Sequence, residues 1–498
     1  MNSILNLEDY ECCLNILSLS YKYLPEHLKP CFLYMGIFLE NQEIRVLQLI
    51  KLWIAEGLVE PDRNSKSLEE IGQDYLKDLI DWNLVLVQKS GAIGNFKTCY
   101  LHDCIRDLCL RIAREEKFVY ASRNHYIPQD ILNEHRVILL GNHLSQEFDI
   151  LYPLRCRTLI CSGGNLPQLE DKSLHVLDAV HINSFEDIFQ HADLRYIGCH
   201  TTSVCRVPST ISNLLSLQTI ICCNSSMVSA PMEIWNMKHL RHVEFSEISL
   251  PDPPSSTAKP DEQILPCLHT FMRIVNFSCS AEVLWRMQRV KKLKIKYDGT
   301  EGDYCIANLH HFSMLESLKI CFCLDTSKNL RLLRRLSFPI SLRQLSLDNL
   351  KLRRADMNIV ASLPNLEDLK LKGITSGSWW GRFRMGFCCL KSLKIVSGDE
   401  VGGVSHLLTI PLEIGDIPGL RVFEIRNIGA VTAISAAKML VDRENYGIEG
   451  LQVKVSFMNK QEMLQFKRLQ ELSNWSISTN FTVEAGPEMR VRSDFWHT

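Results

Sequence analysis

The sequence lacks an excess of charge of either sign, and it lacks any long apolar run. Its 498 residues carry 55 Lys and Arg against 57 Asp and Glu, which gives a net charge of −2. This balance gives no whole-chain reason to expect nucleic acid or an anionic membrane as a partner. The most apolar early stretch, residues 31–39, is far shorter than the ~20 residues of a membrane-spanning helix. The first residues also lack the pattern of a signal peptide. We therefore expect no transmembrane segment and no nucleic-acid partner.

Motifs for catalysis and for metal binding are also missing. No G-x-x-x-x-G-K-[ST], G-x-S-x-G or H-E-x-x-H pattern occurs in the chain. The segment Gly91–Thr98 looks like a phosphate loop, but Phe96 rather than glycine precedes Lys97, and a strand is expected to follow, which predicts a hairpin turn. Cysteines occur in apolar runs or as neighbours such as Cys222-Cys223 and Cys388-Cys389, which predicts small core residues rather than disulfides or a zinc site. We therefore expect neither an enzyme nor a metal centre.

The larger part of the chain repeats itself. The apolar positions of DLRYIGC, SLQTIIC and HLRHVEF recur with a period of 23 residues. Looser copies of the same L-x-x-L-x-L core begin at residues 290, 315, 342, 366, 390 and 420, and weaker ones begin at 156, 174 and 268. A period of about 20–29 residues with this core is typical of the leucine-rich repeat. We predict an α/β solenoid (a horseshoe) of about twelve repeats over residues 151–498, whose long curved surface favours binding over chemistry.

The strand positions between the inward leucines form the expected partner-binding surface. In the later repeats these positions are mostly lysine and arginine, whereas in the earlier repeats they are mixed. The residues predicted to form this surface are Tyr196, Arg241, Lys292, Lys294, Lys319, Arg343, Lys370, Lys372, Lys394 and Arg426. A basic strip fits an acidic partner, or an acidic patch elsewhere in the same protein. The alternative is that these lysines only solvate the strand faces and discourage edge pairing.

The first part of the chain has helical rather than repeat periodicity. Apolar residues recur at helical spacing over residues 11–23 and 44–54. Ser67 and Glu70 have the spacing of a capping box, which predicts a further helix after them. Residues 84–101 contain two apolar runs around a Ser-Gly turn signal, which predicts a hairpin.

A last helix is expected to begin at Asp103. Helices followed by a β-wing and a helix describe a winged-helix domain, so we predict an α+β domain over residues 1–116 and a connector over 117–150. Winged helices often bind DNA, but the charges of the helix at residues 43–56 balance, which argues against a major-groove reader.

Four segments of this part carry a family resemblance. They are LSYKYLPEHLKPCFLYMGIFLENQEI (19–44), LIKLWIAEGLVEP (49–61), LEEIGQDYLKDLIDWNLVLV (68–87) and YLHDCIRDLCLRIARE (100–115). In this order they closely resemble plant coiled-coil NLR (NB-ARC–LRR) disease-resistance proteins, and most of all the late-blight-resistance type of solanaceous plants. The resemblance implies a cytoplasmic protein of plant defence and the hypersensitive response, with peripheral membrane association open. Its repeats would recognise a pathogen effector or a guarded host protein and would restrain an ADP/ATP switch.

The resemblance also implies a nucleotide contact. In that family the histidine of an MHD motif faces the phosphates of the nucleotide, and the matching residues here are Leu101, His102 and Asp103, with leucine in place of methionine. The alternative is a histidine that only closes the wing at a helix start. The family's P-loop, Walker B aspartate and coiled coil have no counterpart in the sequence. We therefore expect an N-terminally truncated chain without ATPase activity or a cofactor of its own, with ADP/ATP implied for the full-length family. The NB-ARC and coiled-coil domains are then further expected partners.

Other functions stay open. A leucine-rich-repeat adaptor of the ubiquitin-ligase substrate-receptor type would need an F-box within residues 19–87. A trans-acting decoy without nucleotide switching would need only the partner surface. An extracellular receptor would need a secretory signal, and it would use the glycosylation sequons at Asn224, Asn276, Asn474 and Asn480.

Overall fold

The structure is a computed structural model, and it divides by contacts into two compact units, Met1–Thr270 and Phe271–Thr498. The residues that it describes are 14, 17–38, 42–61, 66–91, 96–122, 135–139, 156–161, 173–179, 182, 184–201, 205–224, 226–254, 265–298, 304–323, 336–349, 352, 354–373, 386–397, 410, 412–472 and 478–484.

The first unit begins with the winged helix. Its helices are α2 (Lys29–Tyr34), the 3-10 helix η1 (Met35–Ile37), α3 (Val46–Glu56), α4 (Leu68–Asp81) and α5 (Asp103–Glu115), and its strands are β1 (Ile44–Arg45), β2 (Leu86–Ser90) and β3 (Phe96–Tyr100). The strands form an antiparallel sheet in the order β1-β3-β2. The predicted helices, hairpin and winged-helix class are confirmed, although part of the helix predicted over 11–23 lies outside the described residues. A strand begins at Phe96, as expected for a hairpin rather than a phosphate loop.

Local sequence signals explain where α3 ends and where α4 begins. Gly57 ends α3 with a φ of 76°, a left-handed conformation that glycine adopts without a steric penalty. The predicted capping box is present, because the Ser67 side chain accepts from the Glu70 amide and the Glu70 carboxylate accepts from the Ser67 amide at 2.8 Å. A Cβ on Gly72 would lie 2.7 Å from Ile50 Cγ2, so a glycine at this position lets α4 pack closely on α3.

The rest of the first unit is a ladder of parallel strands. They are β4 (Tyr120–Ser122), β5 (Arg136–Leu139), β6 (Thr158–Cys161), β7 (Val176–Ala179), β8 (Tyr196–Thr201), β9 (Thr219–Asn224), β10 (Val228–Ser229) and β11 (His242–Ser249). β4 to β9 pair in chain order, then β9 pairs with β11, and β10 pairs with β11. The returns contain α6 (Phe185–Ile188), η3 (Ser209–Asn213) and η4 (Met232–Asn236). β4 and β5 show that the ladder starts inside the segment predicted as a connector.

The predicted period of 23 residues matches the register of this ladder. Ile197 lies opposite Ile220, which lies opposite Val243, and all three are buried. Pro208 and Pro231, which share the same period, precede η3 and η4. Each repeat therefore places one apolar residue in the same column of the core, as a solenoid requires.

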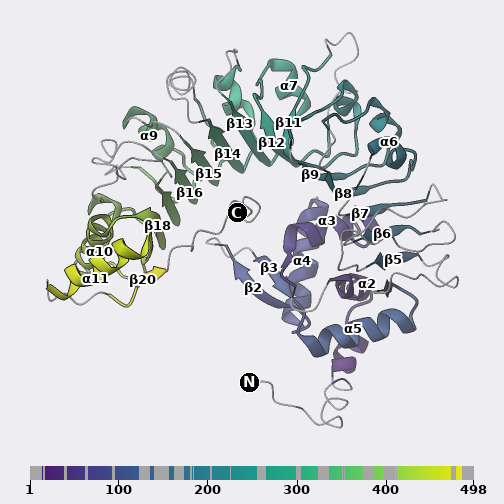
Figure 1. Ribbon diagram of the computed structural model, residues 1–498, viewed down its shortest axis with the longest axis horizontal. Helices are drawn as coiled ribbons and strands as arrows, with labels where there is room; N and C mark the ends of the chain where they lie inside the picture. The colour runs from purple at the N-terminus through teal and green to yellow at the C-terminus, as the bar shows by residue number, and fades with distance from the viewer. Residues whose placement is uncertain are drawn as a thin grey trace. The chain divides into compact units, whose positions relative to one another are not determined.

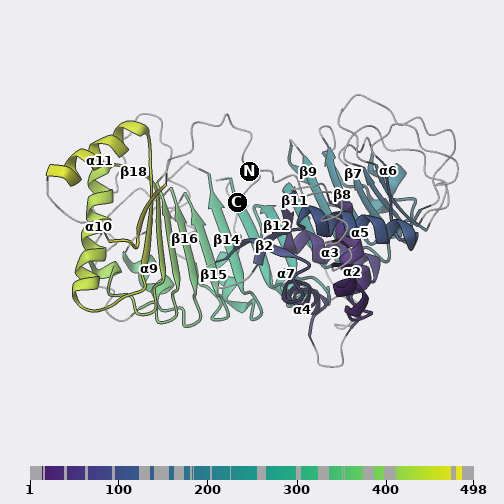
Figure 2. The same ribbon diagram turned by 90° about the horizontal axis from the view of Figure 1, so that it is seen from below.

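The second unit continues the leucine-rich repeats. Its strands are β12 (Thr270–Val275), β13 (Lys292–Tyr297), β14 (Ser317–Phe322), β15 (Gln344–Asp348), β16 (Asp368–Lys372), β17 (Ser392–Val396), β18 (Val422–Ile428), β19 (Gln452–Phe457) and β20 (Phe481–Glu484). Figures 1 and 2 show β13 to β18 side by side in chain order, and β13 to β20 pair in parallel. Its helices are α7 (Ala281–Arg286), η6 (Ile306–His311), α9 (Arg354–Ala361), η7 (Leu412–Ile414), α10 (Ala430–Asn445) and α11 (Lys460–Leu472). The predicted leucine columns are confirmed, with Leu293, Leu318, Leu345, Leu369, Leu393 and Phe423 in one register.

Many of the described cysteines occupy core positions as predicted, but not all of them do; Cys205 in the first unit is exposed. Cys199 and Cys222 lie in one inward column and are buried, whereas Cys223 points to the other face. The expectation of core positions is wrong for Cys388 and Cys389, which are exposed because they lie in the turn that precedes β17 rather than in a strand. All cysteines of the described residues are free.

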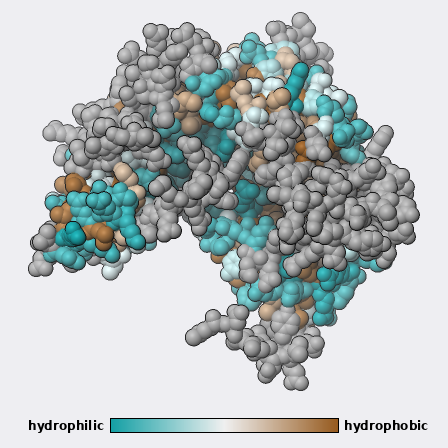
Figure 3. Space-filling view, in the orientation of Figure 1, coloured by the Kyte–Doolittle hydropathy of each residue, from teal (hydrophilic) through white to brown (hydrophobic). Residues whose placement is uncertain are grey.

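Membrane spans and metal sites were not expected from the sequence. None of the helices described is both long and apolar enough to cross a bilayer. The described part of the chain also holds no group of three or more His, Cys, Asp or Glu that could bind a metal ion. The exposed surface of α10 and α11 mixes hydrophilic residues with single apolar ones such as Val431 and Leu464 (Figure 3), which is ordinary for a surface in contact with water.

Candidate functional site

Within the first unit, the winged helix lies against the outward face of the early strands. On β5 to β9, several positions that point away from the leucine core are apolar, and they join the hydrophobic cluster of the winged helix: Ile138, Ile160, Val176, Tyr196 and Ile221. Figures 1 and 2 show α3 beside β7 and β8, and these elements are in contact. Tyr196, predicted to lie on a partner surface, is 1% exposed and packs in this shared core. The two parts therefore share one apolar core.

Charged side chains of α3 pair with the strands at both ends of this contact. The Lys51 ammonium donates to the Glu244 carboxylate on β11, and the Lys51 side chain is only 7% exposed. At the end of α3, the Glu56 carboxylate accepts from Arg136 Nε at 2.9 Å on β5 and from the Thr158 hydroxyl on β6. Each of these pairs joins residues that are 80 or more positions apart in sequence. α3 is thus held across β5 to β11 by ionic contacts as well as apolar ones.

Gln48 of α3 contacts Asp178 on β7, a strand that lies between β6 and β11 in the ladder. Gln48 Nε2 donates to Asp178 Oδ2 at 3.5 Å, a long and weak bond. Burial raises the pKa of Asp178 to about 6, and the Gln48 bond opposes this shift. The side chain has room because its neighbour on β8 is glycine: a Cβ on Gly198 would lie 2.5 Å from Asp178 Oδ1 and 3.0 Å from Tyr196 Cε1.

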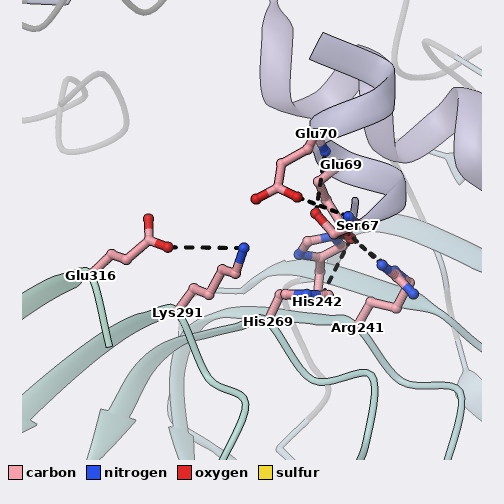
Figure 4. Close-up of polar contacts among 8 residues, drawn as sticks. All are labelled: Ser67, Glu69, Glu70, Arg241, His242, His269, Lys291 and Glu316. Carbon is pink, nitrogen blue, oxygen red and sulfur yellow. Dashed lines mark hydrogen bonds and ion pairs between the residues drawn. The ribbon is translucent and has the colours of Figure 1, made fainter. Parts of the chain in front are cut away.

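The first turn of α4 contributes Glu69, which contacts several side chains of the repeats. Glu69 accepts two bonds from Arg241, at 2.8 Å from Nε and 2.6 Å from Nη2, and a third contact at 3.0 Å joins it to His242 Nε2. His269 Nδ1 lies 3.5 Å from the same carboxylate. Figure 4 shows Glu69 pointing from α4 toward these side chains on the repeats. A bidentate arginine–carboxylate pair fixes both distance and orientation, so it defines the register of α4 on the repeats.

The pKa values of the buried interface residues depend on the charged groups from both sides of the interface. Burial alone would raise the pKa of Glu69, but bonds from His242 and Arg241 hold it well below the usual range. Burial and the Lys51 ammonium lower the pKa of His242 to about 4, so His242 is neutral at pH 7 and its Nε2–H donates to Glu69. Burial likewise opposes ionisation of Glu244, yet Lys51 holds its pKa below the ordinary value. Loss of either member of such a pair leaves a buried charge without compensation.

The three residues expected to contact nucleotide lie at the start of α5. Leu101 is 4% exposed and belongs to the winged-helix core. His102 is the N-cap residue of α5, its side chain is exposed, and it makes no capping bond. Asp103 is exposed in the first turn of the helix. His102 and Asp103 are thus accessible to a ligand, whereas Leu101 has a packing role.

The other residues of the predicted partner surface fall in different settings. Arg241 is occupied by Glu69, as described above. Arg343 precedes β15 and pairs with Glu367 at 2.8 Å. The remaining seven lie at outward positions of β13 to β18 and are half-buried, namely Lys292, Lys294, Lys319, Lys370, Lys372, Lys394 and Arg426.

Sequence reasoning did not find the winged-helix side of the interface, namely Lys51, Glu56 and Glu69. A signal for the repeat side was available, because β6 reads Thr-Leu-Ile-Cys and β9 reads Thr-Ile-Ile-Cys-Cys-Asn, without alternation of polar and apolar residues. Near-continuous apolar strands are typical of sheets that are covered on both faces. The sequence could therefore predict that these strands are covered, but not by what.

Together these features define the class: a leucine-rich-repeat protein whose first repeats carry a winged helix. Residues 37–109 match the family model described as "Disease resistance protein Winged helix domain", and residues 157–451, more than half of the chain, match "Leucine-rich repeat region". The chain belongs to the plant disease-resistance proteins that combine a winged helix with leucine-rich repeats. An adaptor of the ubiquitin-ligase type would need an F-box within residues 19–87, but most of this segment belongs to the winged helix.

Several curated plant proteins are similar to this chain. "ToMV resistant protein Tm-2 netted virescent" of Solanum lycopersicum is 28% identical over 408 residues, which cover 72% of this chain and 46% of that protein. A late blight resistance protein homolog of Solanum demissum is 29% identical over 474 residues, covering 84% of this chain and 36% of that protein. "Probable disease resistance protein RF45" of Arabidopsis thaliana is 27% identical over 406 residues, covering 74% and 39%. The chain spans less than half the length of these relatives.

Proposed function

We propose that this chain works as part of a plant immune receptor, in which the early repeats restrain the winged helix and the later repeats recognise a protein partner. The partner would be a pathogen effector or a guarded host protein. The observation that supports this restraint is the Glu69–Arg241 pair. It joins α4 to the repeats with two short hydrogen bonds in a largely water-excluded setting. Membership of the disease-resistance family supports the role in defence.

The restraint would act through an ADP/ATP switch of the longer receptor. His102 is exposed and makes no capping bond at the start of the thirteen-residue helix α5. A histidine there fits a phosphate group, because the helix N-terminus adds partial positive charge. The adjacent Asp103 carboxylate opposes an anion, so a nucleotide at this place would need further positive groups. His102 would contact the phosphates when a nucleotide-binding domain presents them.

The restraint is tested by a charge swap across the contact. Glu69→Arg places two cations together and should open the contact, whereas Glu69→Arg combined with Arg241→Glu should restore it. The full chain and both variants are expressed transiently in leaves of a solanaceous host, and ion leakage from dying cells is measured at equal protein levels. We expect more cell death from the single variant and a return to the level of the unmodified chain in the swap.

Two outcomes would contradict this proposal. If the single variant opens the contact, as shown by protease sensitivity of α4, but leaves cell death unchanged, the contact does not restrain signalling. If the swap restores the contact while cell death stays high, the effect of the single variant comes from elsewhere. Suppression of a co-expressed receptor by the unmodified chain would instead favour the trans-acting decoy.

A further inference from the structure

The outward face of β13 to β18, within the second unit, carries a column of lysines. The parallel register places Lys294 beside Lys319, then Ser346, then Lys370 beside Lys394. Because neighbouring strands lie ~4.8 Å apart, the column from Lys294 to Lys394 is about 19 Å long. Four ammonium groups thus share a short line across the strands.

Two of these lysines are in ion pairs and two are not. Lys319 pairs with Asp348 at 2.7 Å, and Lys394 pairs with Glu424 at 2.8 Å. Lys294 and Lys370 have no ion pair or hydrogen bond of their side chains within the described residues, and both are half-buried.

The surroundings of these two lysines disfavour their charge. Burial, with added repulsion from Lys319 and Arg273, lowers the pKa of Lys294 to about 8, while Asp348 and Cys321 oppose the shift. Burial likewise lowers the pKa of Lys370 to about 8, with added repulsion from Lys319, Lys394 and Lys372 and only Asp348 in opposition. An anion that reached both ammonium groups would relieve this repulsion.

The pattern of charge favours a polypeptide over a nucleic acid. Acidic side chains, Asp348, Asp368 and Glu424, stand at outward positions of the same strands, and they would repel a continuous phosphate backbone. The outward positions of β13 to β18 also contain no aromatic side chain on which bases could stack. An extended peptide carries separated carboxylates that can meet the lysines and avoid the acids.

We propose that the column Lys294–Lys319–Lys370–Lys394 is a docking site for an extended acidic polypeptide segment, with Lys294 and Lys370 as its two anchoring cations. This inference rests on the proposed role of the later repeats and names the chemistry of the partner. Lys294 and Lys370 are three strands apart, about 14 Å. An extended peptide advances ~3.4 Å per residue, so carboxylates at positions i and i+4, which point to the same side, match the two lysines. The middle position i+2 lies over Lys319 and Ser346.

The test uses two synthetic peptides of equal composition and the full chain. The first peptide alternates glutamate and serine over about seven residues, a length that matches the column. The second has the same residues with the glutamates in one block. Binding is measured by fluorescence anisotropy at low salt. We expect the alternating peptide to bind about tenfold more tightly than the blocked one, because only the first presents all its carboxylates on one side.

Lys294→Gln combined with Lys370→Gln should weaken binding of the alternating peptide about tenfold. Lys438→Gln combined with Lys467→Gln is the matched control, since both residues are exposed on α10 and α11 and the change in charge is identical. Binding by the unmodified chain should also weaken from about pH 7 to about pH 9, because the two ammonium groups lose their protons near pH 8. This pH dependence should vanish in the first double variant. The melting temperature of that variant should not fall, because it removes repulsion.

Three results would overturn the inference. Equal binding of both peptides would show that only net charge matters. Equal weakening by the two double variants would show that the column has no special role. Tighter binding of single-stranded DNA than of the alternating peptide, lost in the first double variant, would assign the column to nucleic acid. None of these results bears on the charge swap at Glu69, so the proposed function and this inference can fail separately.

Discussion

Replacing Glu69 with glutamine should open the contact between α4 and the early repeats. Glutamine keeps the size of the side chain but cannot compensate the charge of Arg241, whose side chain is 11% exposed. Removal of one partner from a buried, hydrogen-bonded charge pair costs about 2–5 kcal/mol. We expect a value toward the lower end, because the Glu69 side chain itself is 16% exposed and water can enter. A loss of about 2 kcal/mol corresponds to a roughly 30-fold higher population of the open state.

The assay is hydrogen exchange of the full chain, followed by mass spectrometry. Peptides from α4 and from β11 report local opening, because their amides are protected only while these elements stay folded and packed. Exchange in these peptides should rise roughly 30-fold in the variant. Peptides from β13 to β18 should keep the exchange of the unmodified chain, since the change lies within the first unit.

Glu70→Gln is the matched control for this experiment. It removes the same charge from the next residue, which is exposed, and glutamine keeps the capping box with Ser67. Any difference between the two variants therefore reports the contact with Arg241 rather than helix capping. Equal exchange in the two variants would refute the reasoning, since it would mean that Glu69 contributes no more to the interface than an exposed glutamate does.

Three further changes test other parts of the first unit. Asp178→Asn should raise the free energy of unfolding by about 3 kcal/mol at pH 7 and by little near pH 4. Burial raises the folded-state pKa of Asp178 from 3.8 to about 6, so its ionised carboxylate is disfavoured in the folded chain only as pH rises through that value; denaturant titrations at both pH values measure this, and an equal gain at both would contradict it. Gly198→Ala should destabilise the early repeats by about 1–3 kcal/mol, since its Cβ would meet Asp178 and Tyr196, and unchanged denaturation midpoints would show that the strands adjust freely. His102→Ala should change stability by less than about 0.5 kcal/mol, because the side chain is exposed without a capping bond; a larger loss in thermal melts would point to a structural role.

Much of the fold follows from local sequence signals. The period of 23 residues predicted which apolar residues share a column, because each repeat must bury the same edge against its neighbours. The Ser67 capping box predicted the start of α4, because it satisfies amides that the helix itself cannot. Such signals operate over a few residues or one repeat, so the sequence carries them plainly.

The charged contacts of the interface could not be predicted in this way. Glu69 and Arg241 are 172 positions apart, and Lys51 and Glu244 are 193 apart. The capping-box spacing identifies the role of Glu70, but nothing in the local pattern marks Glu69 as the partner of Arg241. These pairings follow from the docking of one part of the chain on another, and that docking depends on shape complementarity that no single segment encodes.

The outward residues of the strands nevertheless separate two kinds of repeat. β13 reads Lys-Leu-Lys-Ile-Lys-Tyr, so one face is apolar and the other is charged, whereas β6 reads Thr-Leu-Ile-Cys and has the apolar Ile160 on its outward face. A lysine in place of Ile160 would bring an unpaired ammonium into the shared core, and an isoleucine in place of Lys294 would leave apolar surface without cover. The two positions are therefore not interchangeable, although both fall between inward leucines of the same motif. The early strands carry apolar residues suited to burial under the winged helix, and the later strands carry charged residues suited to contact with water or with a polar partner.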